Sequence, residues 1–186
     1  MVDNLPLEII RSKRRTISIE IKPSSIIVRA PSHMRSQEIS AFVLKKQAWI
    51  EKHWSLMQER QQICELQGLY TIEEVKALAE KALVVIPEKV RHYAPLVGVD
   101  YGRITIRNQR TRWGSCSSKG NLNFNCLLML LPDDVIDSVV VHELCHRKHM
   151  NHSPQFYAEV ERVFPEYKRC NQWLNENGGR YLSRLP

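Results

Sequence analysis

The chain has 186 residues, of which 43% are hydrophobic and 25% are charged. This composition is close to the globular average and excludes a disordered tail or a fibrous repeat. The longest apolar run, Cys126 to Leu131, is far shorter than the roughly 20 residues that span a bilayer, so we predict no membrane partner. The net charge of +7 favours acidic partners without identifying them.

The N-terminus and the cysteines both bear on the cellular compartment. Residues 1–6 contain an acid where a secretory signal has a basic segment, and no apolar segment follows. The five cysteines are scattered without a C-x-x-C pair, and we expect reduced thiols. These features predict a cytoplasmic protein.

The first third of the chain has the pattern of a small sheet followed by a helix. Isoleucines alternate with polar residues over 17–22, which is typical of a strand with one buried face, and 26–30 supplies a second strand. Residues 7–30 therefore predict a small antiparallel sheet. Apolar residues then recur at helical spacing without glycine or proline, which predicts one long amphipathic helix over 37–62.

The middle of the chain returns from helix to strand. A capping-box pair opens an apolar stripe over 72–94, where we expect a second helix that is kinked or restarted at Pro87. Alternating residues then predict strands at 103–107 and 121–126.

The strongest chemical signal lies on the helix that is expected to begin near Pro132. Residues 142–146 have the pattern H-E-x-x-H, and helical residues four apart differ by only about 40° in direction. His142 and His146 can therefore bind one metal ion together, and His152 can return to that ion after the helix ends. The pattern predicts one Zn²⁺ per chain, with its fourth position open for water.

Glu143 adjoins the first ligand and is the candidate catalytic residue. Zinc lowers the pKa of bound water, and a neighbouring carboxylate can accept the proton and return it to a leaving group. His149 competes with His152 as third ligand, but it lies where the helix is expected to be ending. Cys145 points about 100° away from its neighbours on the helix and is predicted to be core. The alternative of ordinary helix histidines leaves unexplained why three of seven lie here.

The sequence resembles the YgjP-like metallopeptidase family, which consists of bacterial metal-dependent hydrolases of the zincin type, related to the WLM and SprT-like groups. The most specific segments are T-R-W-G-S-C-S-S-K-G at 111–120 and H-E-L-C-H-R-K-H-M-N-H-S at 142–153. Residues 14–19, 28–31 and 46–53 also look like that family. The resemblance implies the same three zinc ligands and the same catalytic glutamate as the spacing.

The patterns and the resemblance together imply an α+β fold. Its zincin-like core would pack the H-E-x-x-H helix on a small antiparallel sheet, with an N-terminal β-hairpin lobe and long helices in addition. We expect an N-terminal β-rich lobe and connecting helix over 1–65, and a zincin-like metallohydrolase domain over 66–186.

The resemblance also suggests residues that bind the substrate. In zincins an antiparallel strand beside the active-site helix pairs with an extended peptide, and the strand at 121–126 is the candidate here. Asn123 and Asn125 on that strand are then expected to bind substrate. Tyr157 stands where the family usually has tryptophan and could donate to an oxyanion, with packing as the alternative.

The bend before the third histidine needs its own explanation. Metzincins have the same ligand spacing and carry a glycine three residues after the second histidine, where this chain has His149. Asn151 tolerates left-handed backbone, and we expect it to supply the bend.

Three functions fit these features. The first is a zinc-dependent peptidase acting on a peptide or protein. The second is a metal-dependent nucleotide phosphohydrolase acting on a phosphate-containing small molecule, because Arg110, Arg112 and Lys119 precede the active-site helix. The third is a binding module with a structural zinc, in which the basic segment 11–15 weakly contacts nucleic acid or a protein. The H-E-x-x-H pattern favours the peptidase.

Overall fold

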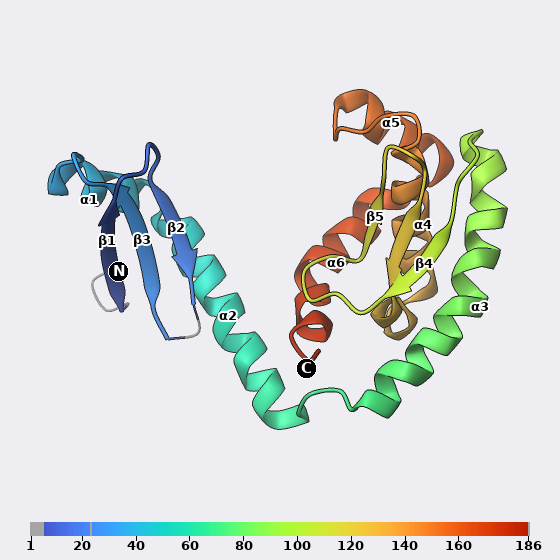
Figure 1. Cartoon of the computed structure of the whole chain (residues 1–186), viewed down its shortest axis with the longest axis horizontal. Coiled ribbons are helices and arrows are strands. Elements are labelled where there is room, and N and C mark those ends of the chain that lie inside the picture. Colours follow the sequence, from blue (N-terminus) through green and yellow to red (C-terminus); the bar gives the residue numbers. More distant parts are fainter. Residues whose placement is uncertain (1–5, 23, 186) are drawn as a thin grey trace. The chain divides into compact units, whose positions relative to one another are not determined.

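The structure is a computed structural model that describes residues 6–22 and 24–185. The chain divides into two compact units, Met1–Gln67 and Gly68–Pro186 (Figure 1), and each unit has its own hydrophobic core. In the described part of the chain, no helix combines the length and the apolar character that crossing a membrane requires.

The first unit contains a three-stranded mixed sheet. Its strands are β1 (Leu7–Ser12), β2 (Ser18–Ile21) and β3 (Ile26–Pro31), in the order β1-β3-β2. β3 pairs antiparallel with β2 but parallel with β1. The prediction of an antiparallel sheet over 7–30 was therefore wrong for β1, because alternation shows which face of a strand is buried and not the direction of its neighbour.

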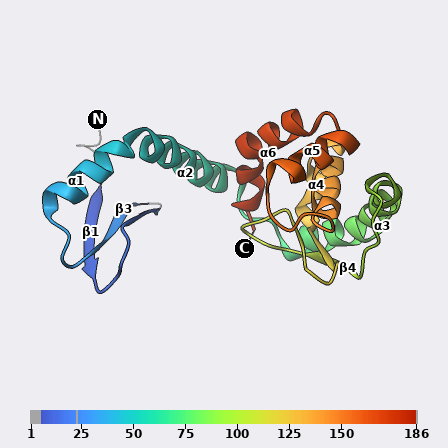
Figure 2. The same cartoon turned by 90° about the horizontal axis from the view of Figure 1, so that it is seen from above.

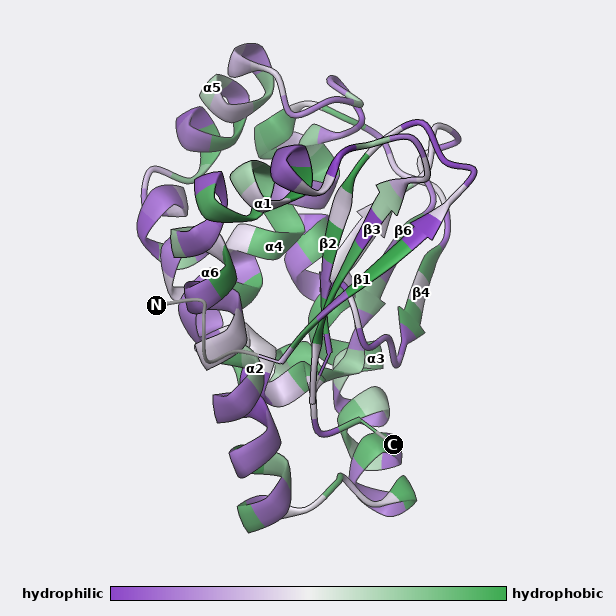
Figure 3. Cartoon of the chain, turned by 90° about the vertical axis from the view of Figure 1, so that its left-hand side faces the viewer, coloured by the Kyte–Doolittle hydropathy of each residue, from purple (hydrophilic) through white to green (hydrophobic). Residues whose placement is uncertain are grey.

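Two helices follow where the sequence predicted one. α1 (Ser36–Lys45) and α2 (Gln47–Gln67) are separated at Lys46, whose amide donates to the carbonyls of Phe42 and Val43. Most of α2 is hydrophilic (Figure 3), and Ile50 is its one buried residue within the described chain. The core of the first unit consists of Ile26, Val28, Ala30, Ile39, Val43 and Ile50.

The second unit begins with α3 (Ile72–Val97), which Thr71 caps through its side chain. We expected a kink or a restart at Pro87; the helix continues through this residue, so the restart was wrong. Pro87 removes the helical partner of the Leu83 carbonyl, and Leu83 lies on the exposed face, where water can replace that bond. Gly98 ends the helix with a left-handed φ of 77°.

A second mixed sheet supports the site. Its strands are β4 (Ile104–Arg107), β5 (Gly114–Cys116) and β6 (Leu122–Asn125), in the order β4-β6-β5. The predicted strands at 103–107 and 121–126 are confirmed, whereas β5 was not predicted. β6 is parallel to β4 and antiparallel to β5, so this sheet is not the purely antiparallel one that we expected. The α+β class itself is confirmed.

The remaining elements surround one central helix. A 3-10 helix, η2 (Cys126–Leu130), leads into α4 (Asp133–Cys145), which is followed by α5 (Pro154–Val163) and α6 (Tyr167–Leu182). α4 lies between β4 and the helices α5 and α6 in Figure 2, and it contacts α3, β5, α5 and α6.

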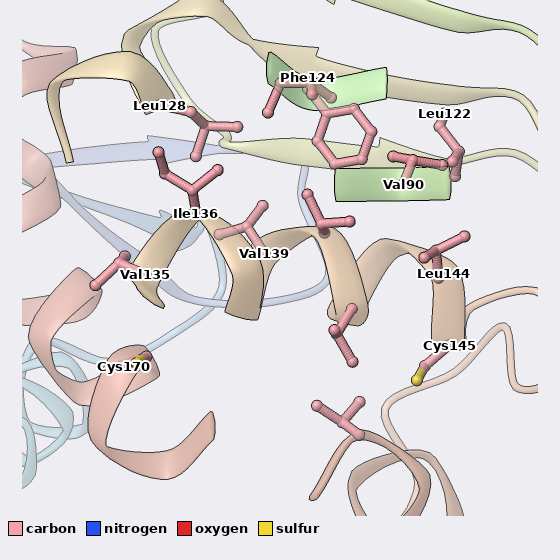
Figure 4. Packing of buried hydrophobic residues seen from close by; sticks show 14 of the residues in the cluster. Val90, Leu122, Phe124, Leu128, Val135, Ile136, Val139, Leu144, Cys145 and Cys170 are labelled. Carbon is pink, nitrogen blue, oxygen red and sulfur yellow. The ribbon is translucent and has the colours of Figure 1, made fainter. Parts of the chain in front are cut away.

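α4 is buried on almost every side. In Figure 4 it lies between the strand that carries Leu122 and Phe124 and the helix that carries Cys170. Cys145 is fully buried in this core, as predicted. The buried residues of α4 are Val135, Ile136, Ser138, Val139, Val140, Val141, Glu143, Leu144 and Cys145. The end of this helix is consequently fixed in place by the core.

Candidate metal centre

The structure brings the three predicted histidines together. His142 lies in the last turn of α4, His146 is its C-terminal cap, and His152 follows in the connection to α5. One ring nitrogen from each lies within 4.8 Å of the others. The Nε2 atoms of His142 and His152 are 3.1 Å apart, close to the roughly 3.3 Å between two nitrogens at about 2.0–2.1 Å from a tetrahedral zinc ion. The three imidazoles therefore fit a single metal ion.

The two helix-borne imidazoles are oriented through their other nitrogen. Nδ1 of His142 is 2.8 Å from the hydroxyl of Tyr167, and Nδ1 of His146 is 3.0 Å from the backbone carbonyl of His149. With Nδ1–H donating to these oxygens, the lone pair of Nε2 is free to bind a metal. His149 thus contributes its carbonyl, and its ring is not part of the cluster.

Burial keeps these imidazoles uncharged. It lowers the pKa of His142 to about 3, with smaller contributions from His146 and His152, and it also lowers the pKa of His146. Only a neutral imidazole has the lone pair that coordinates a metal. His142 and His146 are accordingly ready to bind an ion near neutral pH without first losing protons.

Tight turns bring the third histidine back. The amides of Arg147 and Lys148 donate to carbonyls three residues earlier, and Ser153 then caps α5 by accepting from the Phe156 amide. No described residue other than glycine has a positive φ, so the expected left-handed bend at Asn151 was wrong. Successive i to i−3 bonds already reverse the chain without it.

Ion pairs hold this turn to the rest of the unit. Nζ of Lys148 is 2.7 Å from Glu159 on α5, and Glu159 also pairs with Arg162 at 2.8 Å. Arg162 in turn donates to the Leu96 carbonyl at the end of α3. The hydrogen bond from Arg162, followed by that from Lys148, lowers the pKa of Glu159 to about 2.

Glu143 is a buried carboxylate with one oxygen left unsatisfied. It is 5% exposed, and Oε2 has no hydrogen-bond partner in the described chain. Burial raises its pKa to about 8, and the positive charge of Arg112 opposes that shift. A buried polar atom without a partner is rare in proteins, and at a cluster of metal ligands it is typical of a catalytic group.

Gly114 on β5 provides the space for this carboxylate. A Cβ atom at this position would lie 2.6 Å from Oε1 and 2.7 Å from Cγ of Glu143. Any side chain here would displace the carboxylate from its position, so the close approach of β5 to α4 requires glycine. Gly114 belongs to the T-R-W-G-S-C segment, and the sequence alone did not predict a role for it.

Two pockets meet at Gly114, His142 and Glu143. One, of about 250 Å³, contains the three histidines and is also lined by Ser115, Cys116 and Met150. The other, of about 170 Å³, extends from Glu143 between α4 and α6. Its additional lining residues are Trp113, Ser138, Val139, Tyr167, Asn171 and Leu174. Glu143 thus faces both pockets.

The predicted substrate strand was wrong. β6 is the central strand, and both of its edges are already paired, so it cannot accept a peptide. Asn125 is buried, and its amide donates to the carbonyls of Gln109 and Arg112, while its oxygen caps η2. Asn123 donates to the Ser115 hydroxyl at 3.2 Å. Both asparagines therefore bond within this part of the fold, and β5 is the strand with an open edge at the site.

Arg112 and Tyr157 lie beside the site. Arg112 is exposed, and its charge acts on Glu143. Tyr157 is 38% exposed, and its ring stacks on the His152 ring at a centroid distance of 6.1 Å, with 27° between the ring planes. Neither residue lines the two pockets described above.

An H-E-x-x-H helix end with a third imidazole nearby is typical of metallohydrolases. The sequence matches the YgjP-like, metallopeptidase domain family over residues 15–74 and 73–177, and the chain belongs to this family. It is accordingly a metallopeptidase that uses a catalytic metal and acts on peptides or proteins. The phosphohydrolase and the binding module are not favoured.

Two solved structures are similar to parts of the chain. The metallopeptidase zymogen of Pyrococcus abyssi abylysin is 24% identical, with 50% of this chain and 96% of that chain covered and a TM-score of 0.46. The metallopeptidase zymogen of Methanocaldococcus jannaschii jannalysin is 19% identical, with 49% and 94% covered and a TM-score of 0.44. No curated protein matches the sequence.

Proposed function

We propose that the protein is a zinc-dependent peptidase in which His142, His146 and His152 hold one zinc ion and Glu143 is the catalytic acid and base. The observation that carries the proposal is the convergence of three imidazole nitrogens within 4.8 Å, beside a buried carboxylate with an unsatisfied oxygen. Imidazole ligands suit zinc, and three protein ligands are typical of its catalytic sites.

When bound, zinc supplies a Lewis acid that acidifies water and polarises the scissile carbonyl. Glu143 accepts a proton at its unpartnered Oε2 and releases it to the departing amine. Burial raises its pKa to about 8, so both the protonated and the ionised carboxyl are populated near neutral pH. Tyr157, whose ring lies beside His152, contacts the substrate carbonyl, and Arg112 contacts the substrate from the exposed side of Glu143.

The substrate binds as an extended peptide along β5. Strand addition requires an unpaired edge, and β5 pairs only with β6 in the described sheet. Gly114 of this strand also lies against Glu143, so a peptide on the edge passes the catalytic carboxylate.

Catalysis belongs to the second of the two expected domains, 66–186, since every site residue lies there. The N-terminal lobe, 1–65, is then a separate module that does not contribute to the reacting groups. We also place the protein in the cytoplasm, a reducing compartment that suits its five free cysteines.

The test is cleavage of an unfolded protein such as reduced casein by the zinc-loaded enzyme and by Glu143→Gln. We expect the variant to lose roughly 10³-fold in rate, because general acid and base catalysis commonly contributes about 10²- to 10⁴-fold. Glu161→Gln is the matched control, since this carboxylate on α5 pairs with Lys168 and is not part of the histidine cluster. Equal activity of Glu143→Gln and the parent would contradict the proposal.

A further inference from the structure

The first unit contains an open pocket of its own, beside the strand β2. Its volume is about 220 Å³, and it is lined by Ile19 of β2, Phe42 of α1, Lys46 between the helices and Trp49 of α2. A closed cavity of roughly 150 Å³ already holds a benzene ring, so this pocket has room for one large apolar side chain. Trp49 is 42% exposed and stacks on His53, with ring centroids 4.1 Å apart. The pocket thus offers a fixed aromatic wall, of the kind that anchors binding partners.

The pocket also carries a positive charge that the described chain does not neutralise. Lys46 is exposed, and its side chain has no ion pair or hydrogen bond among the described residues. Lys22 at the end of β2 and Lys45 beside Lys46 are likewise exposed and unpaired within that part of the chain. An apolar pocket with free ammonium groups at its margin suits a ligand that combines an apolar group with negative charges.

The strand beside the pocket has an unpaired edge. β2 pairs with β3 alone in the described sheet, whose order is β1-β3-β2 (Figure 1). The free N–H and C=O groups of such an edge can bind another extended chain. A residue of that chain opposite Ile19 would have its Cβ about 5 Å from that of Ile19, on the same face of the sheet. Because Ile19 lines the pocket, the side chain of that residue would enter it.

We propose that the first unit binds an extended peptide segment by strand addition to β2. One leucine or aromatic side chain of the segment occupies the pocket, and flanking aspartate or glutamate side chains pair with Lys46 and its neighbours. A peptide fits better than a nucleic acid, because only a peptide backbone complements the free edge of β2. Several spread lysines also suit side-chain carboxylates better than the single carboxylate of a chain end. The segment belongs to a protein substrate, and this last statement rests on the proposed peptidase function.

The first experiment measures binding without turnover, in full-length Glu143→Gln. The probe is a fluorescein-labelled peptide, T-V-D-F-D-V-T, with both ends blocked, followed by anisotropy. We expect the further substitution Trp49→Ala to weaken binding at least tenfold and Lys46→Glu at least threefold, in variants whose folding is checked by circular dichroism. Leu44→Ala and Lys52→Glu change exposed residues outside the pocket and should leave binding unchanged. Binding that neither pocket variant weakens overturns the proposal.

The second experiment tests strand addition. Two versions of the peptide are methylated on alternate backbone nitrogens, so that one version loses the donors that face β2. We expect one of them to bind at least tenfold more weakly, and equal binding of both and of the parent peptide overturns strand addition.

Two other occupants of the pocket are tested with the same variants. A single-stranded DNA oligomer that binds more tightly than the peptide, and that Trp49→Ala releases, would overturn the proposal in favour of nucleic acid. A dimer of the chain that Trp49→Ala separates in sedimentation would overturn it in favour of a second copy.

The third experiment tests whether the segment belongs to a substrate. Reduced casein with this segment fused to one end should have a KM at least threefold lower than casein alone, because docking raises the local concentration of the substrate. The kcat should not change, and Trp49→Ala should remove the difference in KM. Equal KM values for the two caseins overturn the assignment to a substrate. Pocket-dependent binding without any cleavage instead supports the docking site and contradicts the peptidase function.

Discussion

The two segments that carry the proposed metal ligands, α4 and the turn over 147–153, are built in different ways. α4 places His142, Glu143 and His146 from a helix whose buried face is part of the main core. The turn places His152 from exposed chain, and contacts such as the pair between Lys148 and Glu159 hold it. The packed core thus fixes the positions of the groups on the helix, whereas the position of the third imidazole depends on a few local contacts.

Because of this difference, substitutions near α4 and substitutions in the turn should have different effects. Changes near α4 should affect individual groups strongly while the fold remains intact, because packed surroundings leave no room for adjustment. Changes in the turn should act more weakly and through metal affinity, because an exposed segment can relax.

Among substitutions around the catalytic carboxyl that leave Glu143 itself in place, the largest effect is expected for Gly114→Ala. The added Cβ would lie 2.6–2.9 Å from three atoms of Glu143 and must displace the carboxylate. A displacement of about 1 Å commonly costs roughly 10²-fold in rate, so we expect kcat/KM to fall by about that factor. Metal content, measured by mass spectrometry, should remain that of the parent. Ser115→Ala on the same strand is the control. If Gly114→Ala were as active as Ser115→Ala, the proposal that Gly114 leaves space for the Glu143 carboxylate would be contradicted.

A smaller effect is expected for Tyr167→Phe. The hydroxyl bonds to Nδ1 of His142, and loss of such an orienting contact typically lowers metal affinity by about 10- to 100-fold. Competition with a zinc chelator measures the change. The rate at saturating metal should stay near that of the parent. Tyr157→Phe serves as the control, because its ring contacts His152 without a hydrogen bond to a ligand in the described structure, and its metal affinity should be unchanged.

The turn itself is tested by Glu159→Gln. Removing the carboxylate charge weakens its pairs with Lys148 and Arg162, and we expect metal affinity to fall less than tenfold. These partners are partly exposed, so the loss of stability should be about 1 kcal/mol at most, or roughly 2 °C in Tm. Glu161→Gln, which changes a more exposed carboxylate on the same helix, is the control. If Glu159→Gln lost metal as completely as a variant without His152, the expectation of a small effect would be contradicted, and the turn would depend on this carboxylate alone.

The same pair predicts a small dependence of stability on pH. The pKa of Glu159 is lowered to about 2 in the folded state, so its stabilising contribution is complete above the ordinary glutamate range. The contribution is lost as the pH falls from that range toward 2. The Tm difference between the parent and Glu159→Gln should therefore shrink between pH 6 and pH 3, as thermal unfolding can measure. A difference that grows on acidification would contradict this sign.

Local geometry made part of the site predictable from sequence. His142 and His146 are adjacent because helical residues four apart share a face, and this requires no knowledge of the fold. Gly114 and Tyr167 were missed as functional residues because their contacts with α4 arise only when distant segments pack together. Gly114 lies in a distinctive segment, which was a usable signal, whereas Tyr167 is 25 residues from His142 and gave none.

The fold was predictable to a similar extent. Capping by Thr71 and the alternation over 103–107 and 121–126 gave elements that the structure contains. β5 has only three residues, too few to show alternation, so β6 was predicted to be the strand that pairs with a peptide. Pairing order and direction depend on long-range contacts, which local patterns do not contain.

The most direct test of the central claim is the metal content of the purified protein and of His152→Ala, with folding checked by circular dichroism. We expect about one zinc ion per chain in the parent and a clear loss in the folded variant, since two imidazoles alone bind the ion weakly. A parent that takes up no metal when zinc is supplied, or a variant that retains it fully, would contradict the three-histidine site.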